Sequence, residues 1–370
     1  MGCPAGSGRQ GPVSNRPRAV LSAARSLRRC GTVTSERTAL RECREYRRPD
    51  GIWARLYAGD STSMAEVAED TVTLTVTSPP YWNAIDYDRH IAAPGTSYRT
   101  RSYASGFDDY ASYLTWVTGV FRETRRVTRP GGFLAVVIGT VLHKGTHYPV
   151  PFDLVAHLVR DGWEFHQDIV WHKTTAGVKR AGVFIQRPYP GYFHPNIMTE
   201  YIVVFRKPGP PIYRRRAAKS YAPVPLGALF THEIANNVWH IAPVPPGQLR
   251  HPCPFPEEIP YRLVQLYSYP GDVVLDPFVG SGQTSKVAVA LGRCAIGYDI
   301  EPQYVQYAHL RLSEPLRVRS QQLVAQFTKV ALDAPQGVLG RTRKAARTRH
   351  GSGLATMRGA LWEDLFAGKK

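Results

Sequence analysis

The chain has 370 residues, of which 43% are hydrophobic, and it carries a formal net charge of +18. This composition predicts a folded protein with a sizeable core, and no apolar run approaches the roughly 20 residues that a membrane span needs. The Arg-rich start of the chain lacks the apolar centre of a secretory signal, so we expect a cytoplasmic protein. Five widely spaced cysteines, with no close pair of the metal-ligand type, indicate a reducing compartment and no metal site.

Most of the positive charge lies in two tails. Residues 1–49 hold eleven Arg against three Glu, and residues 336–370 hold eight Lys or Arg against two acids. Neither tail has sustained periodicity, so we predict a disordered basic arm over residues 1–49 and, over residues 316–370, a C-terminal extension with a disordered basic tail. An organelle transit peptide is a less favoured interpretation of the first tail. The folded domain is predicted between them, over residues 50–315.

The first predicted elements are two strands, over residues 53–58 and 71–77. The second is rich in β-branched residues and ends at Ser78-Pro79-Pro80-Tyr81, where two prolines without backbone donors must stop the ladder. Ser78 and Tyr81 would then lie at the carboxyl edge of a sheet, where open α/β folds place ligands. A turn residue that caps the strand is the alternative interpretation of Ser78.

Helices and strands alternate along the middle of the chain. We predict a helix over 108–127, a stop at Pro130-Gly131-Gly132, a strand over 133–138, a helix over 150–160, and strands over 168–172 and 201–205. Residues 206–254 are rich in Pro and Arg and have weak periodicity, which indicates an inserted lobe or long loops.

A basic segment lies within this middle part. Residues 173–220 contain ten Lys or Arg and a single acid, interleaved with Tyr and Phe. Cations neutralise phosphates and flat rings stack on bases, so this composition is typical of a nucleic-acid surface. A solvated basic face explains the segment equally well when it is considered by itself.

A glycine-rich turn follows the next predicted pair of elements, a helix over 256–267 and a strand over 273–276. Gly280 and Gly282 allow a tight turn and a close ligand approach at the start of a helix over 283–291. The following strand ends at Asp299, about twenty residues after the turn, which is the spacing at which an acid bonds ribose hydroxyls. The turn lacks the Gly-Lys-Ser/Thr ending of a phosphate-binding loop, which disfavours nucleotide triphosphate hydrolysis. It carries Asp276 and Phe278 where a dinucleotide fingerprint has small residues, so we predict a nucleoside ligand with a non-phosphate tail.

These segments together resemble the DNA amino-methyltransferases that use S-adenosylmethionine, in the branch whose catalytic motif precedes its cofactor motif. Ser78-Pro79-Pro80-Tyr81 resembles the catalytic motif, and residues 276–282, Asp-Pro-Phe-Val-Gly-Ser-Gly, resemble the cofactor loop. Residues 251–258 resemble the segment before that loop, and the whole resemblance spans residues 52–312. It implies an α/β fold with a doubly wound, mostly parallel, Rossmann-like sheet and a small recognition lobe, with the recognition elements within 173–250.

The resemblance also implies roles for particular residues. The methyl group passes to the exocyclic amine of a base flipped out of double-stranded DNA. Ser78 and the Pro79 carbonyl would bond that amine, Pro80 would complete the motif, and Tyr81 would stack on the base. The cofactor-binding residues implied are Asp60 at the adenine amino group, Phe255, Asp276, Phe278, Gly280, Gly282, and Asp299 at the ribose hydroxyls.

Several alternatives stay open. The Ser form of the motif is associated with N4 of cytosine, and N6 of adenine is the alternative target. Transfer of the methyl group to RNA or to a protein glutamine is a second alternative, and an inactive DNA-binding protein with this fold is a third. A paired restriction endonuclease would be a partner of a DNA-modifying enzyme of this kind. Cys253 follows a proline, as the nucleophile of cytosine C5 enzymes does, but it lies before the glycine turn instead of after it, so we reject that role. Trp82 is either a stacking surface or a core residue.

Overall fold

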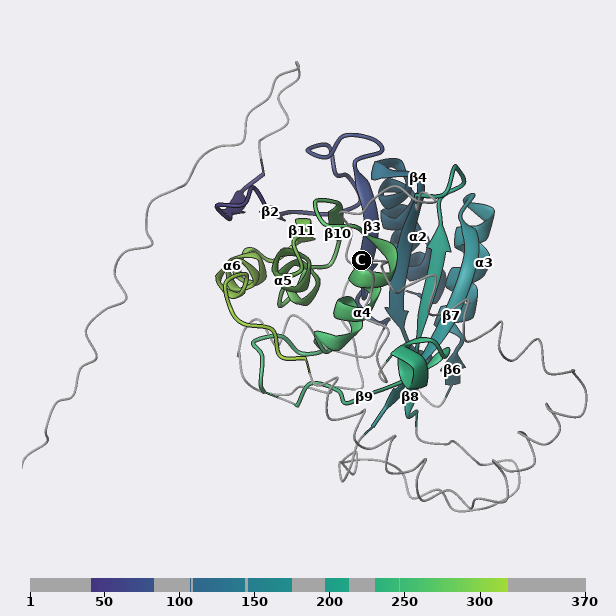
Figure 1. The fold of residues 1–370 in the computed structure, drawn as a ribbon. Helices are drawn as coiled ribbons and strands as arrows, with labels where there is room; N and C mark the ends of the chain where they lie inside the picture. Colours follow the sequence, from purple (N-terminus) through teal and green to yellow (C-terminus); the bar gives the residue numbers. More distant parts are fainter. Residues whose placement is uncertain are drawn as a thin grey trace, which may run out of the picture. The chain divides into compact units, whose positions relative to one another are not determined.

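A nine-stranded sheet forms the centre of the computed structural model, and helices lie on both of its faces (Figure 1). The structure describes residues 41–82, 107, 109–143, 146–174, 197–212, 230–245 and 247–318. No helix in these ranges is both long and apolar enough to cross a membrane.

The strands of the main sheet are β1 (Cys43–Arg47), β2 (Trp53–Ala58), β3 (Val72–Thr77), β4 (Thr128–Ile138), β7 (Glu164–Lys173), β8 (Thr199–Arg206), β9 (Val238–Ile241), β10 (Val273–Asp276) and β11 (Cys294–Asp299). The helices are α2 (Tyr110–Val127), α3 (Val150–Arg160), α4 (Glu258–Tyr267), α5 (Gln283–Ala290), α6 (Pro302–Arg311) and the short π-helix η1 (Phe230–Ile234). A separate antiparallel pair consists of β5 (Val141–His143) and β6 (Thr146–Tyr148).

The strand order across the main sheet is β1-β2-β11-β10-β3-β4-β8-β7-β9. The five strands from β2 to β4 run parallel, β8 is antiparallel to both of its neighbours, β9 is parallel to β7, and β1 is antiparallel to β2. The predicted doubly wound, mostly parallel sheet is therefore confirmed, with antiparallel pairs toward both edges.

Burial on both faces explains why the central strands read as continuous apolar runs. Along β4, Phe133, Ala135 and Val137 face the cluster that includes α4, α5 and α6, whereas Leu134 and Val136 face the cluster that includes α2 and α3. Successive side chains of a strand point to opposite faces, so a strand covered on both sides needs apolar residues at every position. The helices on the two faces of the sheet in Figure 1 provide this cover.

Two strands correct the predicted organisation. Cys43–Arg47 lies within the predicted disordered arm of residues 1–49, yet it forms β1 and pairs with β2 along five residues. Val238–Ile241 lies in the stretch predicted as a lobe or long loops, yet it forms β9 and extends the main sheet beside β7. Both strands are short edge strands, so neither has the long apolar run that identifies a central strand. Residues 1–40 and 319–370 lie outside the described residues, so the rest of both tail predictions is untested.

The start of β4 also differs from the prediction. Pro130-Gly131-Gly132 does not separate helix from strand, because β4 begins at Thr128 immediately after α2. The pairing of β4 with β3 is irregular there: Val72 faces Thr128, and the next paired residues are Leu74 and Phe133. Pro130 therefore lies in an unpaired bulge, which is where a strand tolerates a missing backbone donor.

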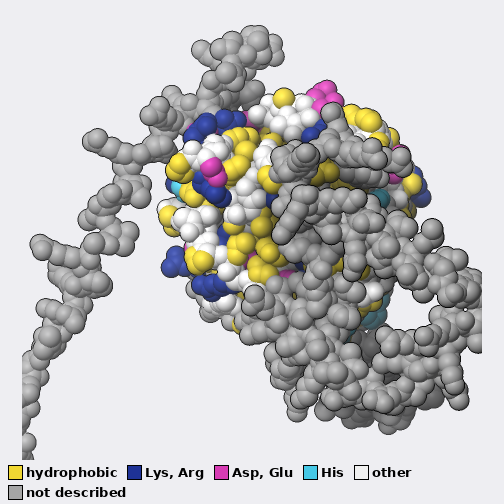
Figure 2. Space-filling view, viewed as in Figure 1, with side chains coloured by type: hydrophobic (Ala, Val, Ile, Leu, Met, Phe, Trp, Pro, Cys, Tyr) yellow, Lys and Arg dark blue, Asp and Glu magenta, His cyan; other side chains and the backbone are white. Residues whose placement is uncertain are grey.

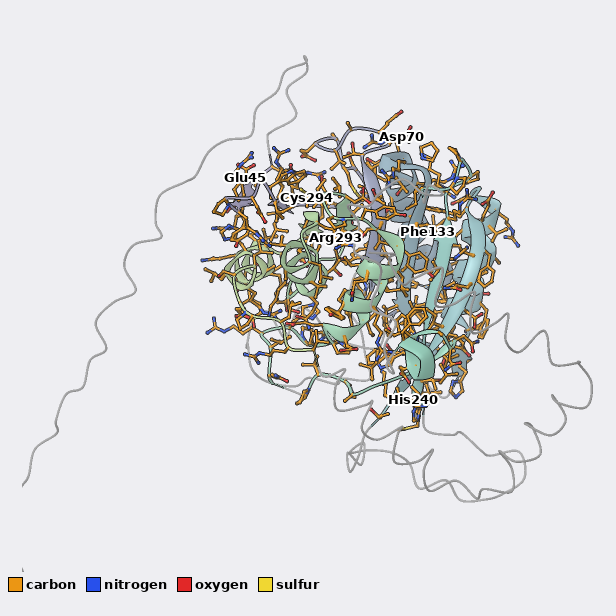
Figure 3. The ribbon with its side chains drawn as sticks, in the orientation of Figure 1. Glu45, Asp70, Phe133, His240, Arg293 and Cys294 are labelled. Atoms are coloured by element: carbon orange, nitrogen blue, oxygen red, sulfur yellow. The ribbon has the colours of Figure 1, made fainter. Side chains whose placement is uncertain are left out.

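The direction of the parallel strands fixes the end of the sheet where ligands are expected. Asp70, which precedes β3, and His240, near the end of β9, lie at opposite ends of the sheet (Figure 3). β3 and β10 are neighbours, with Val274 opposite Leu74, so their carboxyl ends emerge side by side at the end marked by His240. The segment that begins at Ser78 thus lies beside the glycine turn, although about two hundred residues separate them in sequence.

Candidate active site

Hydrogen bonds join the ends of β3 and β10. The hydroxyl of Thr77 donates to Oδ1 of Asp276 at 2.6 Å, and the hydroxyl of Thr284, in α5, donates to the carbonyl of Val76 at 3.0 Å. All three polar residues are almost completely buried, with at most 1% of each exposed. The structure therefore brings the Ser-Pro-Pro-Tyr segment and the glycine turn together, and it does so through two threonines that sequence reasoning did not identify.

Two carboxylates end the neighbouring strands β10 and β11. Burial raises the pKa of Asp276 to about 6, although the Thr77 hydroxyl and the Phe278 N–H, 3.1 Å from its Oδ1, stabilise the ionised form. Burial of the carboxylate likewise raises the pKa of Asp299 to about 6, and the nearby charge of Asp276 acts in the same direction. Two desolvated carboxylates at one site favour a ligand that carries positive charge.

The turn between β10 and α5 requires its glycines. Gly280 and Gly282 have φ values of +45° and +79°, in the left-handed region. A Cβ on Gly280 would lie 2.7 Å from Nε2 of His251, and a Cβ on Gly282 would lie 2.8 Å from Cβ of Ala308. The Gly280 N–H donates to Oδ2 of Asp299 at 2.9 Å, and this hydrogen bond links the turn to the end of β11.

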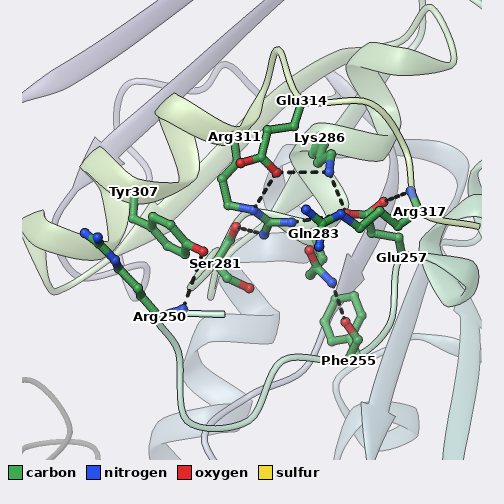
Figure 4. Close-up of polar contacts among 10 residues, drawn as sticks. All are labelled: Arg250, Phe255, Glu257, Ser281, Gln283, Lys286, Tyr307, Arg311, Glu314 and Arg317. Carbon is green, nitrogen blue, oxygen red and sulfur yellow. Dashed lines mark hydrogen bonds and ion pairs between the residues drawn. The ribbon is translucent and has the colours of Figure 1, made fainter. Parts of the chain in front are cut away.

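A network of buried charges fixes the segment before the turn against α5 and α6 (Figure 4). Glu257 contacts Nζ of Lys286 at 2.7 Å and a guanidinium nitrogen of Arg311 at 3.1 Å, and all three side chains are at most 4% exposed. Arg311 also donates to the carbonyl of Ser281, inside the turn. Removing one partner of a buried ion pair leaves an uncompensated charge, so this network ties the turn firmly to its supports.

The remaining predicted cofactor residues surround this turn in different ways. Phe255 is only 9% exposed and packs in the main core, while its carbonyl accepts from Nε2 of Gln283 at 2.8 Å. Phe278 is half-buried, with its ring 5.6 Å from that of Trp116. Asp60 is exposed just after β2, whose Ala58 pairs with Asp299, so it lies at the same edge of the sheet as the turn.

The catalytic-motif candidates begin where β3 ends. Pro79 is buried, whereas Ser78, Pro80 and Tyr81 are half-buried. The hydroxyl of Tyr81 donates to Oε2 of Glu200, in β8, at 2.9 Å. Burial and the Glu200 charge raise the pKa of Tyr81 well above its ordinary value, while a hydrogen bond with the Ser78 side chain acts in the opposite direction. Ser78 and Tyr81 therefore lie within contact of each other, as a shared site requires.

Trp82 belongs to an aromatic cluster and is 6% exposed. Its ring centroid lies 5.0 Å from Tyr110, 5.3 Å from His143 and 4.3 Å from Tyr148. Of the two interpretations of this residue, the core residue is the one that the packing favours.

The predicted recognition elements are only partly described. Within residues 173–220 the structure describes 173–174 and 197–212, so the rest of this basic segment lies outside the described residues. Figure 2 shows Lys and Arg side chains in several separate groups on the described part of one face. In the described ranges, no group of three or more His, Cys, Asp or Glu side chains is arranged to hold a metal ion.

Comparison with known proteins gives a consistent family. Residues 72–310, more than half of the chain, match the N6/N4 family model described as DNA methylase. The Type II methyltransferase M.MthZI of Methanothermobacter thermautotrophicus is 28% identical over 285 residues, which cover 72% of this chain and 78% of that protein. The Type II methyltransferase M.MjaI of Methanocaldococcus jannaschii is 28% identical over 274 residues, covering 67% and 87% of the two chains.

Solved structures agree with this match. A protein of Thermus thermophilus, provisionally named a DNA modification methylase and solved with S-adenosyl-L-methionine, is 30% identical with a TM-score of 0.53, covering 70% of this chain and 92% of its own. The cytosine-N4-specific PvuII DNA methyltransferase has a TM-score of 0.54 at 18% identity, over 75% of this chain and 92% of its own, and so shares the fold. The chain belongs to the N6/N4 DNA methylase family.

Proposed function

We propose that this protein is a site-specific methyltransferase that modifies N4 of a flipped cytosine in double-stranded DNA, with S-adenosylmethionine as its cofactor. The observation that carries the proposal is the 2.6 Å hydrogen bond between Thr77 and Asp276, because it joins the strand end before Ser78 to the glycine turn. The Ser at the head of the catalytic motif supports cytosine, and N6 of adenine is the alternative target. The Type II methyltransferases among the relatives support a paired restriction endonuclease as a partner of this protein. The cytoplasm is the location that we propose for it.

The residues around the turn fit the cofactor. When bound, S-adenosylmethionine supplies an electrophilic methyl group on a positively charged sulfur. The buried carboxylates of Asp276 and Asp299 match a cationic ligand, and the lack of a Cβ at Gly280 lets the ring of His251 pack directly against the turn. We assign Asp299 to the ribose hydroxyls and Asp60 to the adenine amino group.

The amino-acid end of the cofactor is assigned to Asp276 and to the backbone around Phe278, Gly280 and Gly282. Phe255 has a different role in this proposal, because its side chain is in the core. It anchors the segment before the turn, and its carbonyl holds Gln283 at the start of α5.

The catalytic residues act mainly by positioning. The lone pair of an exocyclic amine is delocalised into the base, so the site must accept hydrogen bonds from the amino hydrogens and hold the nitrogen in line for attack. The hydroxyl oxygen of Ser78 and the carbonyl of Pro79 are the acceptors that we assign, and the ring of Tyr81 stacks on the flipped base. Pro80 stiffens the segment that carries these groups.

Expression in a host without DNA methylation, followed by modification-sensitive sequencing, tests the proposal. We expect N4-methylcytosine at one sequence motif. N6-methyladenine alone would show that the base assignment is wrong and leave the rest of the proposal intact. An unmodified genome, together with no transfer of a labelled methyl group to DNA in vitro, would favour a DNA-binding protein without activity.

The two raised carboxyl pKa values predict a pH dependence of cofactor binding. Both pKa values lie near 6, above the ordinary value of 3.8. Each group therefore lowers the free energy of unfolding of the ligand-free protein as the pH rises from about 4 to about 6. A bound cation favours the ionised carboxylates, so binding should release protons near pH 6 and weaken below it, by at most about tenfold per pH unit for each group.

Titration calorimetry with S-adenosylmethionine, in two buffers of different ionisation enthalpy, measures this proton release. We expect a buffer-dependent heat at pH 6 that corresponds to net proton release, and a smaller release at pH 7. Asp299→Asn should reduce the difference at pH 6, and equal heats in both buffers at pH 6 for the wild-type protein would contradict the prediction.

A further inference from the structure

An ion pair whose side chains are 13% and 11% exposed contacts Tyr81. Lys173 is the last residue of β7 and Glu200 is the second residue of β8, and the two strands pair antiparallel. Nζ of Lys173 contacts Oε1 of Glu200, while Oε2 of Glu200 accepts the hydroxyl of Tyr81 at 2.9 Å. Each oxygen of one carboxylate thus has a different partner, and the whole Glu200 residue is 8% exposed.

The neighbouring strand leaves little room for this group to move. Gly139 follows β4, which pairs with β8, and a Cβ at this position would lie 3.0 Å from Cγ of Glu200 and 3.5 Å from Cε2 of Tyr81. The ring of Tyr81 and the side chain of Glu200 therefore pack closely over bare backbone. The position of the Tyr81 ring is therefore set by strands β4 and β8 as well as by the Ser78-Pro79-Pro80 segment that precedes it.

Stability is a weak explanation for this arrangement. Replacing a buried ion pair by apolar side chains of similar size is often neutral or stabilising, because the pair must first be stripped of water. A hydrogen bond to an ionised acceptor is, however, stronger and more directional than a neutral one. The carboxylate of Glu200, which contacts Lys173 through one oxygen and Tyr81 through the other, is suited to hold a phenol in one orientation.

We infer that Glu200 and Lys173 are positioning residues for methyl transfer, which hold the ring of Tyr81 in the plane needed to stack on the target base. This inference rests on the proposed function. It adds two residues of β7 and β8, distant in sequence from the catalytic motif, to the set on which the rate of transfer depends.

The test removes the pair as a unit, so that no charge is left buried without its partner. The variant is Lys173→Met/Glu200→Leu, compared with Tyr81→Phe and with the triple combination. The control is Arg122→Met/Asp161→Leu, which removes the ion pair between Arg122 in α2 and Asp161 just after α3, 2.8 Å apart and outside the predicted recognition segment of residues 173–250. Each protein is assayed for kcat and KM on DNA, for cofactor affinity by calorimetry and for melting temperature.

We expect the pair variant and Tyr81→Phe each to lower kcat roughly ten- to hundredfold, which is the range for loss of a hydrogen bond to a charged group. The triple variant should be no slower than the pair variant, because both changes remove the same contact. Cofactor affinity should stay at the wild-type value, and the control pair should leave kcat unchanged.

The outcomes separate this inference from the proposed function. An active wild-type protein and an equally active pair variant would overturn the positioning role alone, as would losses that multiply in the triple variant. A wild-type protein without activity on DNA would remove both proposals. If the pair variant fails to fold, Tyr81→Phe decides, because it keeps the ring and the ion pair and removes only the hydroxyl: a wild-type kcat would then reject the inference.

Discussion

Ser78→Ala is expected to lower kcat for methyl transfer roughly a hundred- to thousandfold, the range found when one preorganised polar group is removed from a reaction centre. The hydroxyl oxygen of Ser78 is the acceptor that we assign to the amino group of the base, and alanine offers no replacement. Among the described residues, the hydrogen bonds that hold the glycine turn do not include this hydroxyl, so cofactor affinity should change little. Single-turnover transfer of a labelled methyl group to DNA measures the effect.

The control for this change lies next to the other end of β3. Thr71 immediately precedes β3, at the opposite end from Ser78, and its hydroxyl makes a long hydrogen bond of 3.4 Å to the carbonyl of Glu69. Thr71→Ala should therefore transfer methyl groups at the wild-type rate. A Ser78→Ala protein as fast as this control would mean that the residue is a turn former and that the amino group finds its acceptors elsewhere.

Asp299→Ala is expected to raise the dissociation constant for S-adenosylmethionine about a hundredfold or more. The carboxylate accepts the N–H groups of Gly280 at 2.9 Å and of Glu301 at 3.0 Å. Alanine leaves both N–H donors without this acceptor, which costs about 1–3 kcal/mol of stability for each donor that stays buried. It also removes the group that we assign to the ribose hydroxyls of the cofactor. Calorimetry gives the dissociation constant, and denaturant unfolding gives the accompanying loss of stability.

Glu301→Gln is the matched control for Asp299→Ala. It removes a negative charge two residues away and keeps the backbone N–H that Asp299 accepts. Its cofactor affinity should stay within a few-fold of wild type. An Asp299→Ala protein that binds the cofactor as tightly as Glu301→Gln would show that this carboxylate only shapes the turn.

The sequence is informative where a single segment carries its own constraint. Helix α3 is confirmed at the predicted residues, because Pro151 in its first turn and a regular apolar spacing define its start and its buried face. The glycine turn is recognisable for the same reason, since a positive φ at Gly280 and Gly282 limits the residue types that fit.

Contacts between distant segments could not be predicted in this way. Glu200 is 119 residues from Tyr81, and only the register of β8 against β4 brings it there. Thr77 gave no sign of its bond to Asp276, because a buried threonine in a β-branched run is also an ordinary strand residue. The antiparallel edge strand β1 could not be predicted because three of its five residues, Arg44, Glu45 and Arg47, are charged and it has no apolar run.

Strand β1 has a practical consequence for handling the protein. An uncovered strand edge offers unpaired backbone groups to any other chain, and charged side chains make such pairing unfavourable. β1 covers the outer edge of β2 and itself carries Arg44, Glu45 and Arg47. A fragment that begins at residue 50 would therefore leave β2, the strand that leads to Asp60, as an exposed edge strand that is prone to aggregation. A shortened protein for crystallisation should begin before Cys43.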